Sequence, residues 1–196
     1  MSDRTIYAYD TEFLEDGRTI ELISIGIVSD TGREYYAVNS DMPVDRIKAD
    51  PWLLQNVWSQ LPLRGHKSRL QYTGQGDSKH GVRLTAPGVL DTSSVLVKPK
   101  WVIANEVREF LLAEGTPSLW ADYGAYDHVV LAQLWGRMIR LPKGLPMFTN
   151  ELQQALEKAP EEFTPPEQTE GIHNALEDAR HTMRVLKALL KATSHG

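Results

Sequence analysis

No cysteine occurs in the 196 residues of this chain. Its absence excludes disulfide bonds, thiolate zinc sites and cysteine nucleophiles, which leaves carboxylate and imidazole groups as the basis of any catalytic chemistry. A chain of this length buries a hydrophobic core without cross-links. We therefore expect a single domain that spans residues 1–196.

The sequence also lacks a long apolar run. No segment approaches the roughly 20 consecutive apolar residues of a membrane-spanning helix. The N-terminal stretch MSDRTIYAYD is charged from its third residue and does not resemble a signal peptide. We therefore expect a soluble, cytoplasmic protein with no membrane partner.

Positive charge is scarce as well. The chain has 21 Lys and Arg against 26 Asp and Glu, which gives a net charge of −5. Nonspecific duplex binding draws on many Lys and Arg contacts, so this balance disfavours a module that coats nucleic acid through a basic surface. It does not exclude an enzyme that admits one strand end into an acidic pocket, where bound metal ions supply the positive charge.

The order of apolar segments and turn residues predicts an α/β fold. Residues 4–9, 19–28 and 34–38 are rich in Ile, Val and Tyr and are separated by short turns, which predicts an antiparallel three-strand meander. A short buried strand is expected at residues 118–121. Helices are expected at residues 101–113, 125–134, 150–158 (opened by an Asn cap) and 174–192. Together these elements indicate a mixed sheet flanked by helices.

Residues 64–100 differ in composition from the rest of the chain. Five glycines accompany scattered Lys, Arg, Ser and Asp residues there, with only weak alternation of apolar residues. A structureless loop of this length is uncommon in a compact domain. We therefore expect an insertion or a flap at residues 64–100.

Three separated segments carry acidic residues at a predicted strand end or helix start. Asp10 and Glu12 follow the first apolar run, and their carboxylates should lie together because alternate residues of a strand share a face. Asp127 lies near the start of one helix, and His173 and Asp178 lie at the start of the last. Without a cation between them, one member of the Asp10–Glu12 pair should titrate above its ordinary value.

These four carboxylates and one imidazole suit two hard divalent cations. Mg²⁺ and Mn²⁺ prefer oxygen ligands, and a pair of such ions about 4 Å apart clamps the attacking and leaving oxygens of a phosphodiester displacement. A neighbouring histidine is able to take a proton from water, since an unperturbed imidazole titrates near neutrality.

Each residue taken singly also has an ordinary structural explanation. Asp10 and Glu12 would suit a solvated strand edge, and Asp127 would suit pairing with a helix dipole. His173 would suit a loop or a helix cap, and Asp178 an exposed charged helix face. These explanations have to hold independently at three places in the chain, so the combined pattern favours the metal site.

Three motifs stand in order along the chain: Asp10-Thr11-Glu12, Gly124-Ala125-Tyr126-Asp127, and His173 followed five residues later by Asp178. This order resembles the DEDDh 3′-5′ exonuclease superfamily, the ribonuclease H-like fold of ribonuclease T, oligoribonuclease and polymerase proofreading subunits. The stretches YDTEFLEDGRTIELISIGIVSDTGREYYAV and GAYDHVVLAQLWG are similar to the actinobacterial polyadenylate-specific 3′-exoribonuclease AS family. That similarity does not clearly cover residues 64–100.

The resemblance implies a role for each residue. Asp10, Glu12, Asp127 and Asp178 would bind two divalent metal ions, Mg²⁺ or Mn²⁺, directly or through water. His173 would be the general base that deprotonates the attacking water. The reaction would be hydrolysis of the 3′-terminal phosphodiester of single-stranded RNA, with release of nucleoside 5′-monophosphates. A preference for adenylate-rich RNA and a homodimeric state are implied by the resemblance alone.

Several alternatives stay open. The second motif has Asp122-Tyr123 where a His-Asn pair often stands, so Asp122 is a lower-ranked alternative to Asp127. Phe13 is predicted either to stack on the terminal base or to pack in the core, and Tyr126 is predicted to be a core residue. The substrate could instead be DNA, as for a proofreading exonuclease. A non-catalytic RNA-binding module of the same fold is disfavoured, because such a surface gains nothing from concentrated negative charge.

Overall fold

The structure, a computed structural model, describes residues 4–65 and 88–194. The strands in these ranges are β1 (Arg4–Glu15), β2 (Ile20–Ser29), β3 (Glu34–Asn39), β4 (Leu63–Arg64), β5 (Val89–Leu90), β6 (Val97–Lys98), β7 (Thr116–Ala121) and β8 (Asn150–Glu151). The helices are α1 (Val44–Ala49), α2 (Pro51–Asn56), α3 (Lys100–Leu112), α4 (Ala125–Ala132), α5 (Leu152–Leu156) and α6 (Ala175–Thr193). Short 3₁₀ turns occur at Trp58–Gln60, Gln133–Trp135 and Met138–Arg140.

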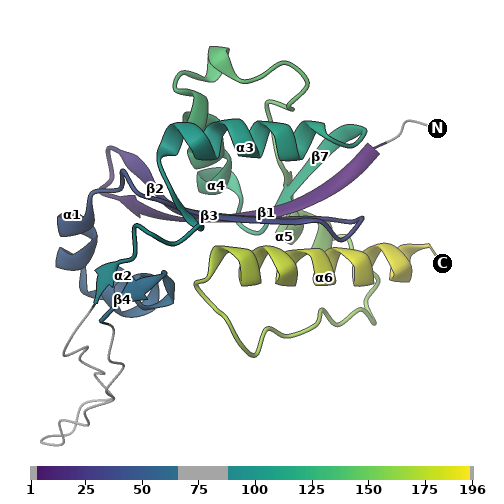
Figure 1. Cartoon of the computed structure of the whole chain (residues 1–196). Coiled ribbons are helices and arrows are strands. Elements are labelled where there is room, and N and C mark those ends of the chain that lie inside the picture. The colour runs from purple at the N-terminus through teal and green to yellow at the C-terminus, as the bar shows by residue number, and fades with distance from the viewer. Residues whose placement is uncertain (1–3, 66–87, 195–196) are drawn as a thin grey trace, which may run out of the picture.

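Six of these strands form one mixed sheet in the order β6-β3-β2-β1-β7-β8. The first three strands form an antiparallel meander, and β7 runs parallel to β1. α3 and α4 cover one face of the sheet, and α6 lies on the other (Figure 1). The predicted α/β class and the N-terminal meander are therefore confirmed.

β1 contributes to the hydrophobic core on both faces of the sheet. Tyr7 and Tyr9 are buried in the cluster that includes residues of α3 and α4, while Ile6 and Ala8 pack with residues of α6. Because side chains alternate along a strand, residues 10 and 12 continue the row that faces α6. The apolar alternation of β1 thus places the acidic pair under the start of α6.

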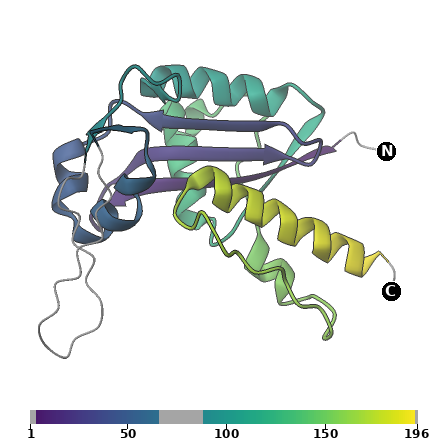
Figure 2. The same cartoon turned by 60° about the horizontal axis from the view of Figure 1, so that its bottom comes forward.

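Gly26 of β2 allows the first turn of α6 to lie directly on the sheet. It is the register partner of Asp10 on β1. A Cβ atom at Gly26 would lie 2.3 Å from the carbonyl carbon and oxygen of Ala175, the first residue of α6. Figure 2 shows α6 crossing the long strands on this face. The absent side chain therefore brings the His173–Asp178 segment close to β1.

Gly26→Ala is expected to destabilise the fold, because the added methyl group meets backbone atoms that cannot rotate away. We expect a loss of about 1–3 kcal/mol in the free energy of unfolding, as for other overpacked sites. Urea denaturation measures it. Ser24→Ala, which shortens a side chain two residues away on the same strand, is the matched control. A Gly26→Ala protein as stable as the parent would show that α6 does not approach β2 this closely.

β1 is longer than predicted. The sequence places Asp10 and Glu12 at the end of a strand over residues 4–9, but the ladder with β2 continues to Glu15. The strand continues because backbone pairing with β2 does not require apolar side chains. The register shifts once, between Glu12 and Phe13, directly after the acidic pair.

The predicted helix at residues 150–158 starts in the wrong place. Asn150 is not a helix cap: it lies in β8, pairs with Trp120 of β7, and its side-chain amide donates to the Leu119 carbonyl at 2.8 Å. α5 begins at Leu152, and Glu151 caps it. The cap prediction failed because a two-residue strand has no local sequence signature.

The insertion or flap predicted at residues 64–100 falls largely on residues 66–87, which lie outside the described residues. At its flanks, β4 and β5 pair as an antiparallel ladder. Among the described residues, no helix is long and apolar enough to cross a membrane.

Candidate metal centre

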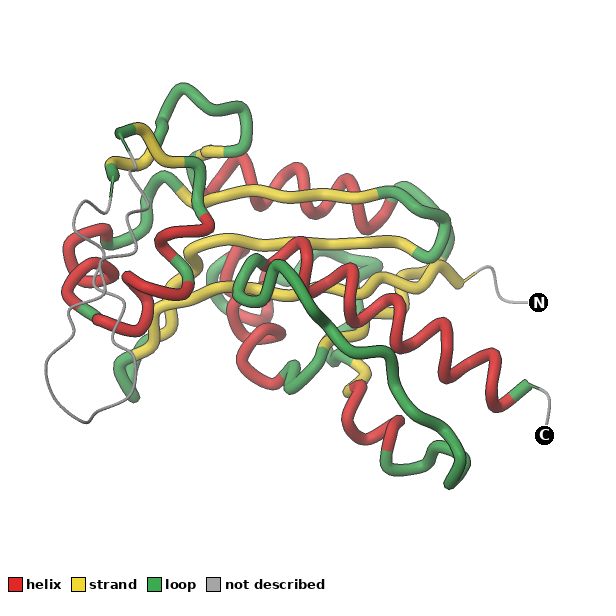
Figure 3. Tube along the Cα trace, turned by 90° about the horizontal axis from the view of Figure 1, so that it is seen from below, coloured by secondary structure: helices red, strands yellow, loops and turns green. Residues whose placement is uncertain are grey.

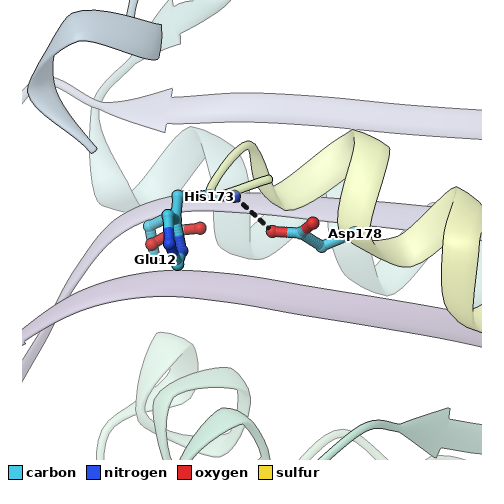
Figure 4. A group of neighbouring side chains, drawn as sticks. All are labelled: Glu12, His173 and Asp178. Atoms are coloured by element: carbon cyan, nitrogen blue, oxygen red, sulfur yellow. Dashed lines mark hydrogen bonds between the residues drawn. The ribbon is translucent and has the colours of Figure 1, made fainter. Parts of the chain in front are cut away.

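Three potential metal ligands meet between β1 and the start of α6. In the described part of the chain, a carboxylate oxygen of Glu12, a ring nitrogen of His173 and a carboxylate oxygen of Asp178 all lie within 4.8 Å of one another. Figure 4 shows the three side chains, with Glu12 from β1 and the other two from the last helix and the turn before it. The sequence predicted that these segments converge, and the structure brings them together.

The turn before α6 is shaped to present His173. The loop from α5 runs back along α6 before it enters the helix (Figure 3). His173 has a φ of 67°, a left-handed conformation that few non-glycine residues adopt and that is costly unless other contacts hold it. Its backbone N–H donates to Asp178 Oδ2 at 3.0 Å, and Asn174 then caps the helix. Gln168 donates to the other Asp178 oxygen at 2.6 Å.

Trp52 contacts His173 from α2. The two rings meet edge to face, with centroids 4.8 Å apart. Asp50 caps α2 by accepting from the backbone N–H groups of Trp52 and Leu53, which fixes the first turn of this helix. Trp52 is 52% exposed, so it packs against the imidazole at the surface of the site. The sequence did not single out this residue.

Asp127 approaches β1 from the opposite face of the sheet, and neither it nor Asp10 belongs to the group formed by Glu12, His173 and Asp178. It lies in the first turn of α4, is buried, and its Oδ1 accepts from the backbone N–H of Thr11 at 2.8 Å and from the Thr11 hydroxyl at 2.6 Å. The parallel ladder between β1 and β7 ends at Ala8, which leaves the Thr11 N–H available. Thr11 is buried, and its backbone and hydroxyl hold Asp127 against the α4 face of β1, opposite the face that carries Asp10 and Glu12.

Asp122 is bonded elsewhere, to the Gln153 side-chain amide at 2.7 Å. Beside it, the carboxylate of Glu151 accepts from the backbone N–H groups of Tyr123 at 2.9 Å and Gly124 at 2.8 Å. Tyr123 has a positive φ of 51°. Glu151 therefore braces the turn that leads into α4 and Asp127. The pairing of β8 with β7 places Glu151 for these bonds.

Glu151→Ala should displace Asp127 without unfolding the chain, since it leaves two N–H groups of a strained turn without their acceptor. We expect the affinity for Mn²⁺ to fall about 10–100-fold, the usual range for residues that orient metal ligands, with little change in far-UV circular dichroism. Glu157→Ala, at an exposed position just after α5, is the control. Parent-level Mn²⁺ affinity in Glu151→Ala would show that the turn does not depend on this carboxylate.

The electrostatics of the four carboxylates favour a bound cation. Burial, followed by the nearby charges of Asp127, Glu12 and Asp178, raises the pKa of Asp10 well above its ordinary value. Burial and the charges of Asp178 and Asp127 raise the pKa of Glu12 to about 8. We expected one residue of the pair to have a raised pKa, and the pKa of both residues is raised. The larger cause of these pKa shifts is burial, not the repulsion between the two carboxylates on which the sequence-based expectation rested.

The other two carboxylates are perturbed in the same direction. Burial raises the pKa of Asp127 to about 6, although the Thr11 hydrogen bonds oppose the shift. Burial also raises the pKa of Asp178, against the hydrogen bonds from Gln168 and His173. In the described part of the chain, no Lys or Arg forms an ion pair with any of the four. Such a set of hard, unneutralised oxygen donors fits divalent cations.

An aromatic pair lies beside the acidic residues. Phe13 stacks on Tyr126, with ring centroids 5.9 Å apart and an angle of 13° between the planes. Phe13 is partly buried against the core, whereas Tyr126 is 58% exposed. The prediction that Tyr126 is a core residue is therefore wrong, because its position in the first turn of α4 faces outward.

The chain is similar in sequence to two curated proteins. No protein-family model matches the chain. Two curated relatives, both named 3′-5′ exoribonuclease and both from Mycobacterium tuberculosis (strains CDC 1551 / Oshkosh and ATCC 25618 / H37Rv), are each 38% identical to it over 192 residues. The matched residues cover 97% of this chain and 96% of each relative. The similarity thus extends over every segment that contributes to the site.

Proposed function

Because the chain belongs to the family of 3′-5′ exoribonucleases, we propose that it hydrolyses the 3′-terminal phosphodiester of single-stranded RNA and releases nucleoside 5′-monophosphates. The observation that carries the proposal is the meeting of Glu12, His173 and Asp178, with Asp127 bonded to Thr11 beside them. The order of the motifs supports membership of the DEDDh superfamily, with its ribonuclease H-like fold, and a place near the polyadenylate-specific AS family.

Asp10, Glu12, Asp127 and Asp178 would hold two divalent cations, Mg²⁺ or Mn²⁺. When bound, these ions would offset the repulsion among the carboxylates and stabilise the charge that develops on the phosphate oxygens. The oxygen donors, their raised pKa values and the absence of a described Lys or Arg partner fit this role. Thr11 keeps Asp127 oriented, and Gln168 does the same for Asp178.

His173 would act as the general base. Its imidazole would take a proton from the water that attacks phosphorus, while the bond between phosphorus and the 3′ oxygen of the upstream nucleotide breaks. The hydrogen bond from the His173 backbone to Asp178 fixes the turn, and Trp52 limits the rotation of the ring. These contacts hold the base in place before substrate binds.

The test is a digestion of 5′-labelled single-stranded RNA with Mg²⁺ or Mn²⁺. The proposal predicts a ladder that shortens from the 3′ end, with nucleoside 5′-monophosphates as products. Labelled products that do not form a continuous ladder, or cleavage that persists in a chelator, would overturn the proposal.

Incubating RNA and DNA of one sequence together decides between an RNA-directed and a DNA-directed enzyme. Comparing adenylate-rich RNA with RNA of mixed sequence measures base preference. Light scattering tests the homodimer that the family resemblance implies.

His173→Ala should lower kcat by about 10²–10⁴-fold, the usual contribution of a positioned general base. Metal affinity, measured by calorimetric titration with Mn²⁺, should change little, because the proposed role is proton transfer. His181→Ala, at a histidine within α6, is the matched control. The ring nitrogen of His173 lies as close to Glu12 and Asp178 as a ligand would. A large loss of Mn²⁺ affinity would therefore reassign His173 from base to ligand.

A further inference from the structure

A groove of about 780 Å³ lies on the α4 side of the site, between the β1–β2 turn and the first turns of α3 and α4. Its walls include Arg18 and Glu21 from the turn and its flanking strand, Lys100 from α3, and Tyr126 and Val129 from α4. The five predicted site residues do not line it. Its volume falls within the range of pockets that hold drug-sized ligands.

The groove borders the candidate metal centre through the aromatic pair. Tyr126 lines the groove, precedes Asp127 and stacks on Phe13, which itself follows Glu12. Tyr126 and Val129 are 58% and 46% exposed, so they present apolar surface on which a nucleobase can stack. A ligand in this groove would therefore be in reach of the ring of Tyr126, which is next to Asp127 in the sequence.

The charges of the groove suit a phosphate. Glu21 is paired with Arg46, and the Glu15 carboxylate accepts the backbone N–H of Gly17 at 2.9 Å. Lys100 and Arg18 line the groove and form no ion pair with any residue in the described ranges. They are the two side chains there able to neutralise a strand backbone.

The geometry of the displacement indicates which part of the substrate would occupy the groove. In an in-line displacement, the attacking water and the leaving 3′ oxygen lie on opposite sides of phosphorus. His173, beside which the water would lie, is on the α6 face, whereas Asp127 and Tyr126 approach from the α4 face. The leaving oxygen, and the strand attached to it, would therefore point towards Tyr126.

We propose that this groove is the binding subsite for the nucleotide immediately upstream of the scissile phosphate, with Tyr126 stacking on its base and Lys100 and Arg18 contacting its phosphates. The inference rests on the proposed function, since it needs an RNA strand that is cut at the metal centre. It assigns a substrate-positioning role to Tyr126, for which the family resemblance implies none.

The experiment compares two substrates of the metal-loaded enzyme. One is an oligoribonucleotide, and the other is the p-nitrophenyl ester of uridine 5′-monophosphate, in which nitrophenol replaces the upstream strand. Tyr126→Ala should lower the ratio of kcat/KM on RNA to kcat/KM on the ester about tenfold. Tyr126→Phe, which keeps the ring, should restore the parent ratio. Lys100→Ala should lower the ratio and reduce the slope of log KM for RNA against log salt concentration by about 0.7. Lys143→Ala, at an exposed position outside the groove, is the charge control.

A ratio that stays at the parent value in both Tyr126→Ala and Lys100→Ala would overturn the subsite. An equal loss on both substrates would also overturn it, because it would place these residues at the reacting phosphate or in the fold. A parent protein that hydrolyses neither substrate would instead overturn the proposed function, and the subsite with it. The ester therefore separates a failure of the subsite from a failure of the activity.

Discussion

Glu12→Gln is expected to lower RNA hydrolysis by about 10³-fold or more, comparable to the loss of a group that stabilises a transition state in a dry site. The substitution keeps the shape of the side chain but removes a carboxylate that is 8% exposed and lies against His173 and Asp178. A neutral amide offers a weaker ligand to a divalent cation. Steady-state kinetics with saturating Mn²⁺ measures the loss.

Glu157→Gln is the control for Glu12→Gln, since Glu157 is exposed just after α5 and lines neither the site nor the groove. Its effect on hydrolysis should be small. If Glu12→Gln kept activity within a few-fold of the parent, the carboxylate cluster would not be the catalytic centre. A similar loss in both variants would point to a general effect of charge instead.

The metal-free protein is expected to lose stability as the pH rises from about 5 to 8. Glu12 keeps its proton up to about pH 8 in the folded chain, whereas an unfolded glutamate releases it near its ordinary value of 4.5. Between these values the folded state holds more protons, so the free energy of unfolding falls with rising pH. At 1.36 kcal/mol per pKa unit, Glu12 alone accounts for on the order of 4 kcal/mol.

Thermal denaturation in a chelator at pH 5, 6.5 and 8 measures this loss. Mg²⁺ or Mn²⁺ should raise the melting temperature more at pH 8 than at pH 5, because the ions bind the deprotonated carboxylates. Glu12→Gln should flatten the pH dependence and stabilise the chelated protein at pH 8. Equal stability of the chelated parent at pH 5 and pH 8 would contradict the raised pKa values.

Much of the site was predictable because its signals are local. Asp10 and Glu12 are spaced to share a strand face, and His173 and Asp178 stand at a capped helix start. The turn-separated apolar runs likewise predicted the meander. The strands, turns and helix starts behind these predictions are each encoded in a short stretch of consecutive residues, so periodicity and capping rules apply to them.

The supporting residues were not predictable in this way. The hydrogen bonds of Glu151 at the start of α4 depend on the pairing of β8 with β7. The hydrogen bonds between Thr11 and Asp127 depend on the β1–β7 ladder ending before Thr11. Trp52 of α2 contacts His173, which lies just before α6. These contacts depend on how distant segments are placed in space, which a single sequence does not display. Only the family resemblance ranked Asp127 above Asp122 in the sequence, and their hydrogen bonds, to Thr11 and to Gln153, favour the same order.

A crystal soaked with Mn²⁺ and a nucleoside 5′-monophosphate, with anomalous diffraction recorded from the manganese, tests the two-metal site itself. The proposal predicts two anomalous peaks about 4 Å apart among the carboxylates of Asp10, Glu12, Asp127 and Asp178, with the phosphate of the nucleotide beside them. Peaks elsewhere with none at this cluster would contradict the proposal. So would a manganese ion bound by Asp122 while Asp127 contacts only Thr11.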